Sequence, residues 1–341
     1  MKEILSLHLG QAGCQIGHAC WELFCLEHGL QPNGTLATRT CPDASMLTFF
    51  EDLDTKFTPR MLYIDFESNV LDEVRTGVYR QLFAPARIIS GKEDAASNYA
   101  RGYFTLGREF LEHIVEQIRQ MTIRCESLQG FVLFHSFGGT GSSLSSLILE
   151  RLKDEYEKKT RFQFVIFPSP KLASFITEPY NTVFNTHFGL EYTDCVFIVD
   201  NEALWDICTQ LLKISEGNFV NINRLIAQVI SNITSGSRFS NGNVVDLMEF
   251  QTNLVPFPRI HFPLVSYAPL QSLNRTYHEQ IDPSSLTQEL FHRHNQMIKV
   301  EPSAGKCMSI AMIYRGLLSP LDVTSTINKL KTDRRISFVD W

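Results

Sequence analysis

The chain has 341 residues, of which 44% are hydrophobic and 20% charged, a composition that indicates a globular protein of about two domains. The formal net charge is −6 without a basic stripe, which argues against nucleic acid as the main partner. No apolar run reaches the roughly 18 residues of a membrane-spanning helix. The first residues, MKEILSLHLG, do not form a signal peptide. Eight cysteines without C-x-x-C pairs indicate reduced packing residues in a cytoplasmic protein.

Short apolar runs alternate with helical patterns over the first 215 residues. Strands are predicted at 4–9, 61–66, 131–135, 162–167 and 195–200. Helices are predicted over about 11–28, shortly after 66, along an amphipathic stretch from 106 to 121, from the 136–143 turn to about 159, after 179 and up to about 212. Uninterrupted apolar strands joined by helices indicate a parallel sheet covered on both faces. Ligands of such sheets bind beyond the carboxyl ends of the strands.

The second half of the chain has a different texture. Residues 218–236 combine an apolar face with uncharged polar residues, which predicts a helix buried between two domains. Another helix is predicted after the SNGN turn, and from Pro256 onward prolines recur among short apolar runs, as in a smaller mixed α/β domain. The long polar connection over 31–59 is of a length that is usually functional or disordered.

Two glycine-rich turns follow predicted strands. HSFGGTGSS (135–143) places small residues before a helix, where backbone N–H groups can face an anion. GQAGCQIG (10–17) offers Gly10 and Gly13 for close approach and Gln11 and Gln15 as donors to phosphate oxygens. Neither turn matches the P-loop or the dinucleotide fingerprint. The lack of the dinucleotide fingerprint nearly excludes a nicotinamide-dependent enzyme. Taken alone, each also fits an ordinary strand-to-helix turn.

Acidic residues mark the other predicted turns. Asp65 and Glu67 end the second strand, where they could hold Mg²⁺ through its water shell or simply be solvated acids. Asp94, in GKEDAASNY, could cap the helix that follows. Asp246 and Glu249 share a helix face and could polarise a water molecule, but two acids in a first turn also suit the helix dipole.

Together these segments resemble tubulin of the α type, in a divergent form. The matching stretches are, in order, GQAGCQIG, ACWELFCLEHG, GKEDAASNYARG, LQGFVLFHSFGGTGS, EPYN, DNEALWDIC, NINRLIAQ, EFQTNLVPFPRIHFPL, YHEQ and FVDW. The resemblance runs from residue 1 to 341. It implies a Rossmann-like parallel-sheet GTPase domain (1–201), a connecting region with a core helix (202–249) and a smaller mixed α/β domain (250–341) that is incomplete, with the C-terminal helical domain absent.

The resemblance implies a site for GTP and Mg²⁺. Phosphates would be held by Gly10, Gln11, Ala12 and Gln15 and by the loop of Ser136, Gly138, Gly139, Thr140 and Gly141. Glu67 would lie at the Mg²⁺, with Asp65 and Asp94 nearby, and Ser174 and Glu178 on the ribose side. Asn201 and Asn223 would read the guanine edge and Phe219 would stack on the base.

Glu249 decides the type within the family. The resemblance implies that this glutamate, assisted by Asp246, promotes hydrolysis of the nucleotide on the neighbouring subunit. It also implies β-type tubulin as the partner, the microtubule lattice as the assembly, tubulin-folding chaperones as helpers, and the cytoplasmic cytoskeleton as the location.

The chain also departs from the family pattern. Its phosphate loop has one glycine fewer before Thr140, and Ser143, which could cap the next helix, replaces the last glycine. Ser97 and Phe219 replace an asparagine and a tyrosine, and Arg39 stands where the α type carries an acetylated lysine, which excludes that modification. The alternative is therefore a tubulin-derived chain that does not polymerise and binds nucleotide weakly or not at all. Because the apolar RISFVDW (335–341) predicts a strand with an open edge, we expect poor solubility alone, association with chaperones or a β-type partner, and no normal microtubules.

Overall fold

A six-stranded parallel sheet lies at the centre of the computed structural model, which describes residues 2–37, 44–169, 171–173, 175–214, 217–239, 246–272, 282–316, 318–332 and 336–340. Its strands are β1 (Glu3–Leu9), β4 (Met61–Asp65), β5 (Ile88–Ser90), β6 (Leu128–Ser136), β7 (Thr160–Phe167) and β8 (Cys195–Asp200). They are arranged in the order β5-β4-β1-β6-β7-β8. The predicted α/β fold with a parallel sheet is confirmed.

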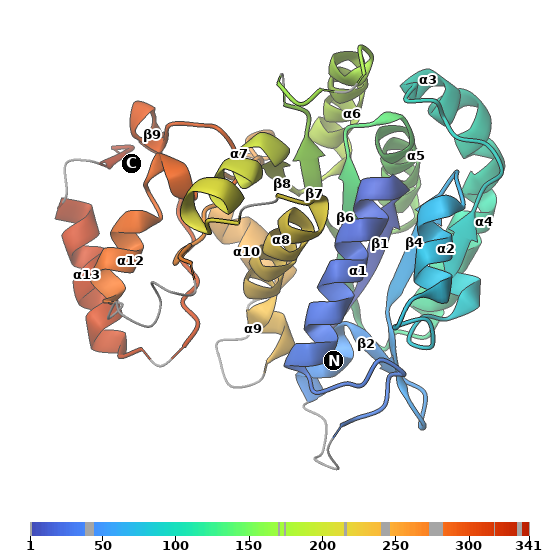
Figure 1. Cartoon of the computed structure of the whole chain (residues 1–341), viewed down its shortest axis with the longest axis horizontal. Coiled ribbons are helices and arrows are strands. Elements are labelled where there is room, and N and C mark those ends of the chain that lie inside the picture. Colours follow the sequence, from blue (N-terminus) through green and yellow to red (C-terminus); the bar gives the residue numbers. More distant parts are fainter. Residues whose placement is uncertain are drawn as a thin grey trace.

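Helices cover both faces of this sheet (Figure 1). One face packs against α1 (Gly10–Glu27), α2 (Asn69–Thr76) and α8 (Phe219–Ile233), and the other against η3 (Gly102–Leu106), α4 (Gly107–Ile123), α5 (Gly139–Glu155) and α6 (Glu178–Tyr192). Successive side chains of β1 point to opposite faces of the sheet, so the core has two halves. Ile4 faces α1 and α8, while Leu5 and Leu7 face α4 and α5. Because both faces are covered, the strands are buried and mainly apolar, as the sequence predicted. Short helices η2 (Pro85–Arg87) and α3 (Tyr99–Arg101) complete this half.

The described part of the 31–59 connection is structured. It contains η1 (Ala44–Thr48) and an antiparallel pair, β2 (Phe50–Asp52) and β3 (Phe57–Pro59). Met46, Phe49 and Phe50 are buried against Trp21 and Phe24 of α1. Disorder, one of the two alternatives for this connection, is therefore wrong for these residues, because three large apolar side chains anchor them to the core. A functional role for the connection stays a prediction. Residues 38–43, which include Arg39, lie outside the described residues.

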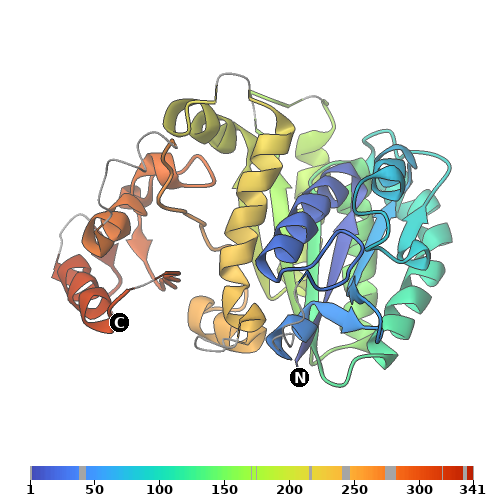
Figure 2. The same cartoon turned by 60° about the horizontal axis from the view of Figure 1, so that its bottom comes forward.

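The predicted core helix is α8, which lies between α1 and the C-terminal segment (Figure 2). Ile222, Leu225, Ile226 and Ile230 bury its apolar face. Before it come α7 (Asn201–Asp206) and η4 (Ile207–Leu211), and after it come α9 (Ser235–Arg238) and α10 (Leu247–Leu254). Buried Arg238 donates to Glu27 at the end of α1 (2.7 Å), and Arg315 of the C-terminal segment donates to the same carboxylate (2.7 Å). This ion network ties three parts of the chain together.

The C-terminal part contains short elements. They are α12 (Pro283–Glu289), η5 (Arg293–Asn295), η6 (Pro302–Ala304), β9 (Lys306–Cys307), α13 (Pro320–Thr332) and β10 (Ser337–Phe338). In the predicted strand at 335–341 only Ser337 and Phe338 form a ladder, with β9, and residues 335 and 341 lie outside the described part. The apolar runs near 262 and 310 form no helix or strand among the described residues, apart from one isolated bridge from Ser266 to Gln296. Among the described helices, none combines the length and apolarity needed to cross a membrane.

Candidate nucleotide-binding site

The strand order places the topological switch point of the sheet, where parallel α/β sheets have their ligand crevice, between the carboxyl ends of β1 and β6. From β1 the chain first adds β4 and β5 on one side and then β6, β7 and β8 on the other, so the connections diverge at this point. Gly10 starts α1 with a φ of +69°, which favours glycine, and a Cβ there would lie 3.3 Å from the backbone N of Gly141. The two predicted glycine-rich turns therefore touch, and two helix N-termini open into one crevice.

Three glycines shape the turn after β6. A Cβ on Gly139 would lie 2.6 Å from the Cα of Ser97, and one on Gly141 would lie 2.6 Å from the carbonyl oxygen of Ser136, so both positions require glycine for packing. A Cβ on Gly138, by contrast, would meet only the Oγ of Ser136 at 3.6 Å. The turn is thus packed on two sides and open at Gly138, which leaves room for an anion at the start of α5.

The start of α5 differs from the prediction. The helix begins at Gly139, inside the predicted loop, and its N-cap is Gly138. The Ser143 hydroxyl donates to the carbonyl oxygens of Gly139 (2.7 Å) and Thr140 (3.2 Å). Ser143 is thus the fifth residue of α5, and the prediction that it caps the helix is wrong. Inside the helix, the Ser143 hydroxyl bonds back to the carbonyl oxygens of the preceding turn.

Asp94 reaches into the same turn. Its carboxylate accepts from the Thr140 hydroxyl (3.1 Å) and from the backbone N of Ala96 (3.1 Å). The cap of the following helix is instead Asn98, which accepts from the N of Ala100 (2.9 Å), so the capping role suggested for Asp94 is wrong. Asp94 thereby joins the 91–99 turn to the start of α5.

Two residues that the sequence left unassigned support this turn. Thr177 Oγ1 and Asn181 Nδ2 each donate to the carbonyl oxygen of Ser97 at 2.8 Å, and Asn181 Oδ1 accepts from the N of Tyr99 (3.1 Å). Asn181 is buried at the start of α6, within the EPYN motif. Its amide offers a donor and an acceptor together, the feature that could have identified it.

Glu178, predicted for the ribose side, is the first residue of α6 and is half-buried. Its carboxylate Oε1 accepts from the backbone N of Phe175 at 3.3 Å. Ser174, its predicted companion, lies outside the described residues.

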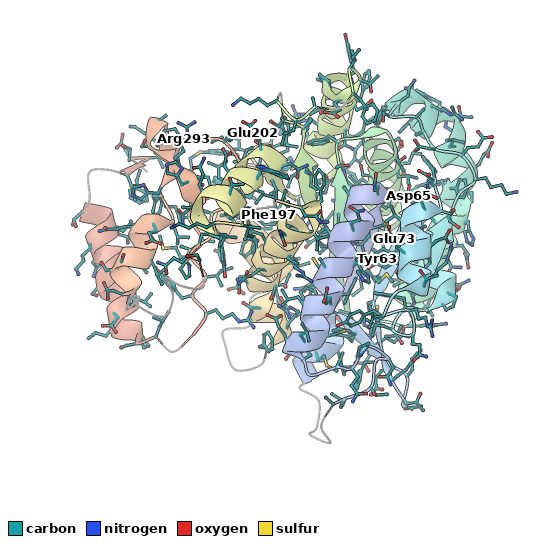
Figure 3. The ribbon with its side chains drawn as sticks, viewed as in Figure 1. Tyr63, Asp65, Glu73, Phe197, Glu202 and Arg293 are labelled. Carbon is teal, nitrogen blue, oxygen red and sulfur yellow. The ribbon has the colours of Figure 1, made fainter. Side chains whose placement is uncertain are left out.

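The two carboxylates after β4 have different environments. Asp65 is only 5% exposed, and burial raises the pKa of its carboxyl group to about 7, with smaller contributions from the charges of Asp94 and Glu67. Figure 3 shows Asp65 at the upper end of its strand, above Tyr63. Glu67 is exposed and accepts from the Asn69 amide. The burial of Asp65 does not fit the alternative that the acids at this strand end are simply solvated. A nearby cation would favour the ionised form of its carboxyl group.

Few direct ligands for a metal ion converge at this edge. Among the described residues, no group of three or more His, Cys, Asp or Glu side chains could hold a metal ion. The donor set fits Mg²⁺ held largely through its own waters, as it commonly is beside substrate phosphates.

The glutamines of α1 lie on its first turns. Gln11 is exposed, and Ala12 and Gln15 are half-buried. Gln11 and Gln15 are four residues apart and share one helix face, next to Gly10. The helix position brings both amides to the β1 side of the crevice.

Three residues predicted for the base lie at the starts of α7 and α8. Asp200 caps α7 by accepting from the N of Glu202 (2.9 Å), and Asn201, which follows the cap, makes no side-chain hydrogen bond to the described residues. Phe219 opens α8 with 59% of its surface exposed, and Asn223 lies one turn later on the same face. An unpaired amide and an exposed ring are what recognition of a base requires.

Glu249 and Asp246 lie at the other end of the sheet. Asp246, the N-cap residue of α10, pairs with Lys2 at the start of β1, and Gln251 donates to Asp194, just before β8. Seven residues of β1 separate this end from Gly10, a span of about 23 Å. Glu249 is exposed in the first turn of α10. The structure thus does not bring these two acids to the crevice of the same chain.

The described cysteines fit a packing role. The pKa of each thiol is raised by burial, for Cys20 above its usual range and for Cys25 and Cys195 to about 12. The other described thiols, Cys14, Cys125, Cys208 and Cys307, shift in the same direction. A thiol that stays protonated is a poor nucleophile.

Comparison with known proteins agrees with this geometry. Residues 3–209 match the model of the Tubulin/FtsZ family, GTPase domain, and residues 258–341 match the Tubulin C-terminal domain. The tubulin alpha-2 chain of Caenorhabditis elegans is 49% identical over 344 aligned positions, which cover all of this chain and 77% of that relative.

Proposed function

The chain belongs to the tubulin family and is of the α type, and from this premise we propose that it binds GTP with Mg²⁺ in the crevice between β1 and β6. The observation that carries the proposal is the contact between Gly10 and Gly141, which joins two glycine-rich turns at the carboxyl edge of the sheet. The GTPase-domain match includes both turns.

We assign the phosphate contacts to backbone N–H groups and polar side chains of these turns. Gly10 to Ala12 and Gly138 to Gly141 start helices whose N-terminal N–H groups lack intrahelical partners. Those groups and the helix dipoles favour an anion. Gln11, Gln15 and the hydroxyls of Ser136 and Thr140 add donors. Asp94 holds Thr140 in place through the 3.1 Å hydrogen bond.

Glu67 would hold Mg²⁺ through its waters, with Asp65 behind it. Bound Mg²⁺ would neutralise charge on the β- and γ-phosphates. Asp65, whose pKa is about 7 in the ligand-free chain, would ionise as the cation approaches. On the base side, Asn201 and Asn223 pair with the guanine edge, Phe219 stacks on its face, and Ser174 and Glu178 line the ribose.

We further propose that the chain acts as the α-type subunit of a heterodimer with β-type tubulin and enters cytoplasmic microtubules. Supporting this, apolar side chains are exposed next to the crevice, among them Phe175, Ile176 (92% exposed), Tyr180 and Val183. Apolar patches on a soluble protein mark contact surfaces. Glu249, remote from its own crevice, would then polarise water at the nucleotide of the next subunit, with Asp246 assisting and tubulin-folding chaperones aiding assembly.

The domain division follows the same premise. We assign residues 1–201 to nucleotide binding, 202–249 to the connection that holds α8, and 250–341 to the smaller domain. The ranges of the two family matches, 3–209 and 258–341, support this division.

Competition between GTP and ATP tests the assignment of the base site. Asn223→Ala should weaken GTP binding by roughly 1–3 kcal/mol, because edge groups of the base lose their partner. Asn221→Ala is the matched control, since it removes the same amide two residues earlier on α8 and from another face. Equal binding of GTP and ATP by the wild-type chain would disprove guanine selection. No nucleotide binding at all would favour a tubulin-derived chain that does not polymerise.

A further inference from the structure

A cationic corner lies beside α7, at the nucleotide end of the sheet. It consists of exposed His292, Arg293 and His294. The segment that follows is fixed to the sheet, since Met297 accepts from the N of Asp200 at the end of β8 (2.8 Å) and donates from its own N to Val265 (2.9 Å). Arg293 lines a hollow together with Ala203 and Asp206 of α7, and Figure 3 shows Arg293 and Glu202 in the upper part of the view.

Two acids beside this corner are paired with lysines. Lys299 pairs with Glu202 and with Asp206 (2.8 Å), and Lys171 pairs with Glu202 (3.1 Å). These partners hold the pKa of Glu202 at about 2. Arg293 has no acidic partner among the described residues, and a guanidinium stays charged at any physiological pH. Arg293 is therefore a positive charge that no described acid pairs, in a chain whose net charge is −6.

The shape beside Arg293 fits one carboxylate side chain. A hollow of about 120 Å³ is lined by Arg293, Lys299 and Gln210 and floored by Ile207 and Leu211. The guanidinium fork matches a carboxylate with two parallel hydrogen bonds. Asp206 also lines the hollow, and its charge opposes a doubly charged phosphate more than a single carboxylate.

The corner also adjoins an apolar surface. Lys171, which pairs with Glu202, precedes exposed Leu172, and exposed Phe175 and Ile176 follow in the same loop. An apolar area with charged residues at its rim is the usual anatomy of a protein–protein interface, in which Arg is enriched.

We propose that Arg293 binds an acidic side chain of the tubulin subunit that covers the nucleotide end of this chain. The inference rests on the proposed assembly, and it predicts an acidic side chain of the partner opposite Arg293. No hydrogen bond or ion pair joins Arg293 to the described residues assigned to the nucleotide, so we expect nucleotide binding to be independent of it.

Charge reversal tests the contact. The complex with co-expressed β-type tubulin is purified, and its dissociation constant is measured at low and high salt. Arg293→Glu should weaken the complex roughly tenfold at low salt, and the loss should shrink as salt screens the repulsion. Lys158→Glu, an exposed charge reversal just before β7 at the opposite end of the sheet, is the matched control and should have no effect.

Bound GTP is measured for each variant, so that the two proposals fail separately. The inference is supported if both variants keep the wild-type amount of bound GTP and only Arg293→Glu binds the partner more weakly. Equal affinities for the Arg293→Glu and Lys158→Glu complexes would overturn it while leaving the nucleotide site intact. The inference would also be overturned if inorganic phosphate displaced the wild-type partner as strongly as expected for a specific anion site. The lack of any complex would overturn it as well.

Discussion

Two adjacent glycines at the start of α5 separate packing from ligand binding. A methyl group on Gly139 would lie 2.6 Å from the Cα of Ser97 and 2.7 Å from the N of Asn98. That is roughly 1 Å inside an ordinary contact. A methyl group on Gly138 would meet only Ser136 Oγ at 3.6 Å. Gly139→Ala must therefore force two backbone segments apart, whereas Gly138→Ala fills the open side of the turn.

The expected magnitudes differ accordingly. Overpacking at Gly139 should cost about 2 kcal/mol of unfolding free energy and, for a chain of 341 residues, lower Tm by roughly 3 °C. Gly138→Ala should change the unfolding free energy by less than about 1 kcal/mol, since only a glycine cap is lost. It should nevertheless weaken GTP binding roughly tenfold or more, because the methyl group occupies the space assigned to a phosphate.

Thermal unfolding without nucleotide and titration with a fluorescent GTP analogue measure the two effects separately. Both variants and the wild-type chain are compared under the same conditions. Equal Tm values for the two variants, or full GTP binding by Gly138→Ala, would refute the reasoning.

Four further predictions concern the site and its surroundings. Asn201→Ala should lower GTP affinity by roughly 1–3 kcal/mol in calorimetry and leave ATP binding unchanged; an equal loss for both nucleotides would contradict the base-edge role. Glu249→Ala should leave GTP hydrolysis by the isolated chain unchanged and slow it only in an assembly with β-type tubulin; a large loss in the monomer would exclude action on the neighbour. Inserting one glycine before Thr140 should tighten GTP binding, and an unchanged affinity would mean that the short loop already closes around the phosphates. Burial lowers the pKa of His135 to about 4, so its neutral form supports the fold above about pH 6.5, and this stability is lost as pH falls toward 4. The difference in unfolding free energy between pH 7 and pH 5 should therefore be about 2 kcal/mol smaller for His135→Asn in urea titrations.

The sheet was predictable because its strands are apolar on both faces. Runs such as 131–135 and 162–167 contain one polar residue each, and a parallel sheet with two covered faces is the fold that buries them. The C-terminal runs were not predictable in the same way. Residues 308–313 are as apolar as a strand, yet a strand also needs a neighbour, and only Lys306 and Cys307 find one in the described part, in β10.

The meeting of Gly10 and Gly141 was also predictable, because turns after neighbouring parallel strands share an edge. Which of two similar neighbouring residues takes which role was not predictable. Asp94 and Asn98 both precede the short helix and are both good caps by composition, but only Asn98 has the spacing to accept from Ala100. Asp65 and Glu67 differ in burial through the pleat and the packing around Asp65, which a sequence does not state.

A guanine nucleotide in the crevice between β1 and β6 is the central claim, and the nucleotide that copurifies with the chain tests it most directly. Denaturing the purified protein and separating the released nucleotides by anion exchange identifies and counts them. We predict about one guanine nucleotide for each wild-type chain, and its loss in Gly138→Ala without loss of the fold. A folded wild-type chain that carries no nucleotide, or an adenine nucleotide, would contradict the account.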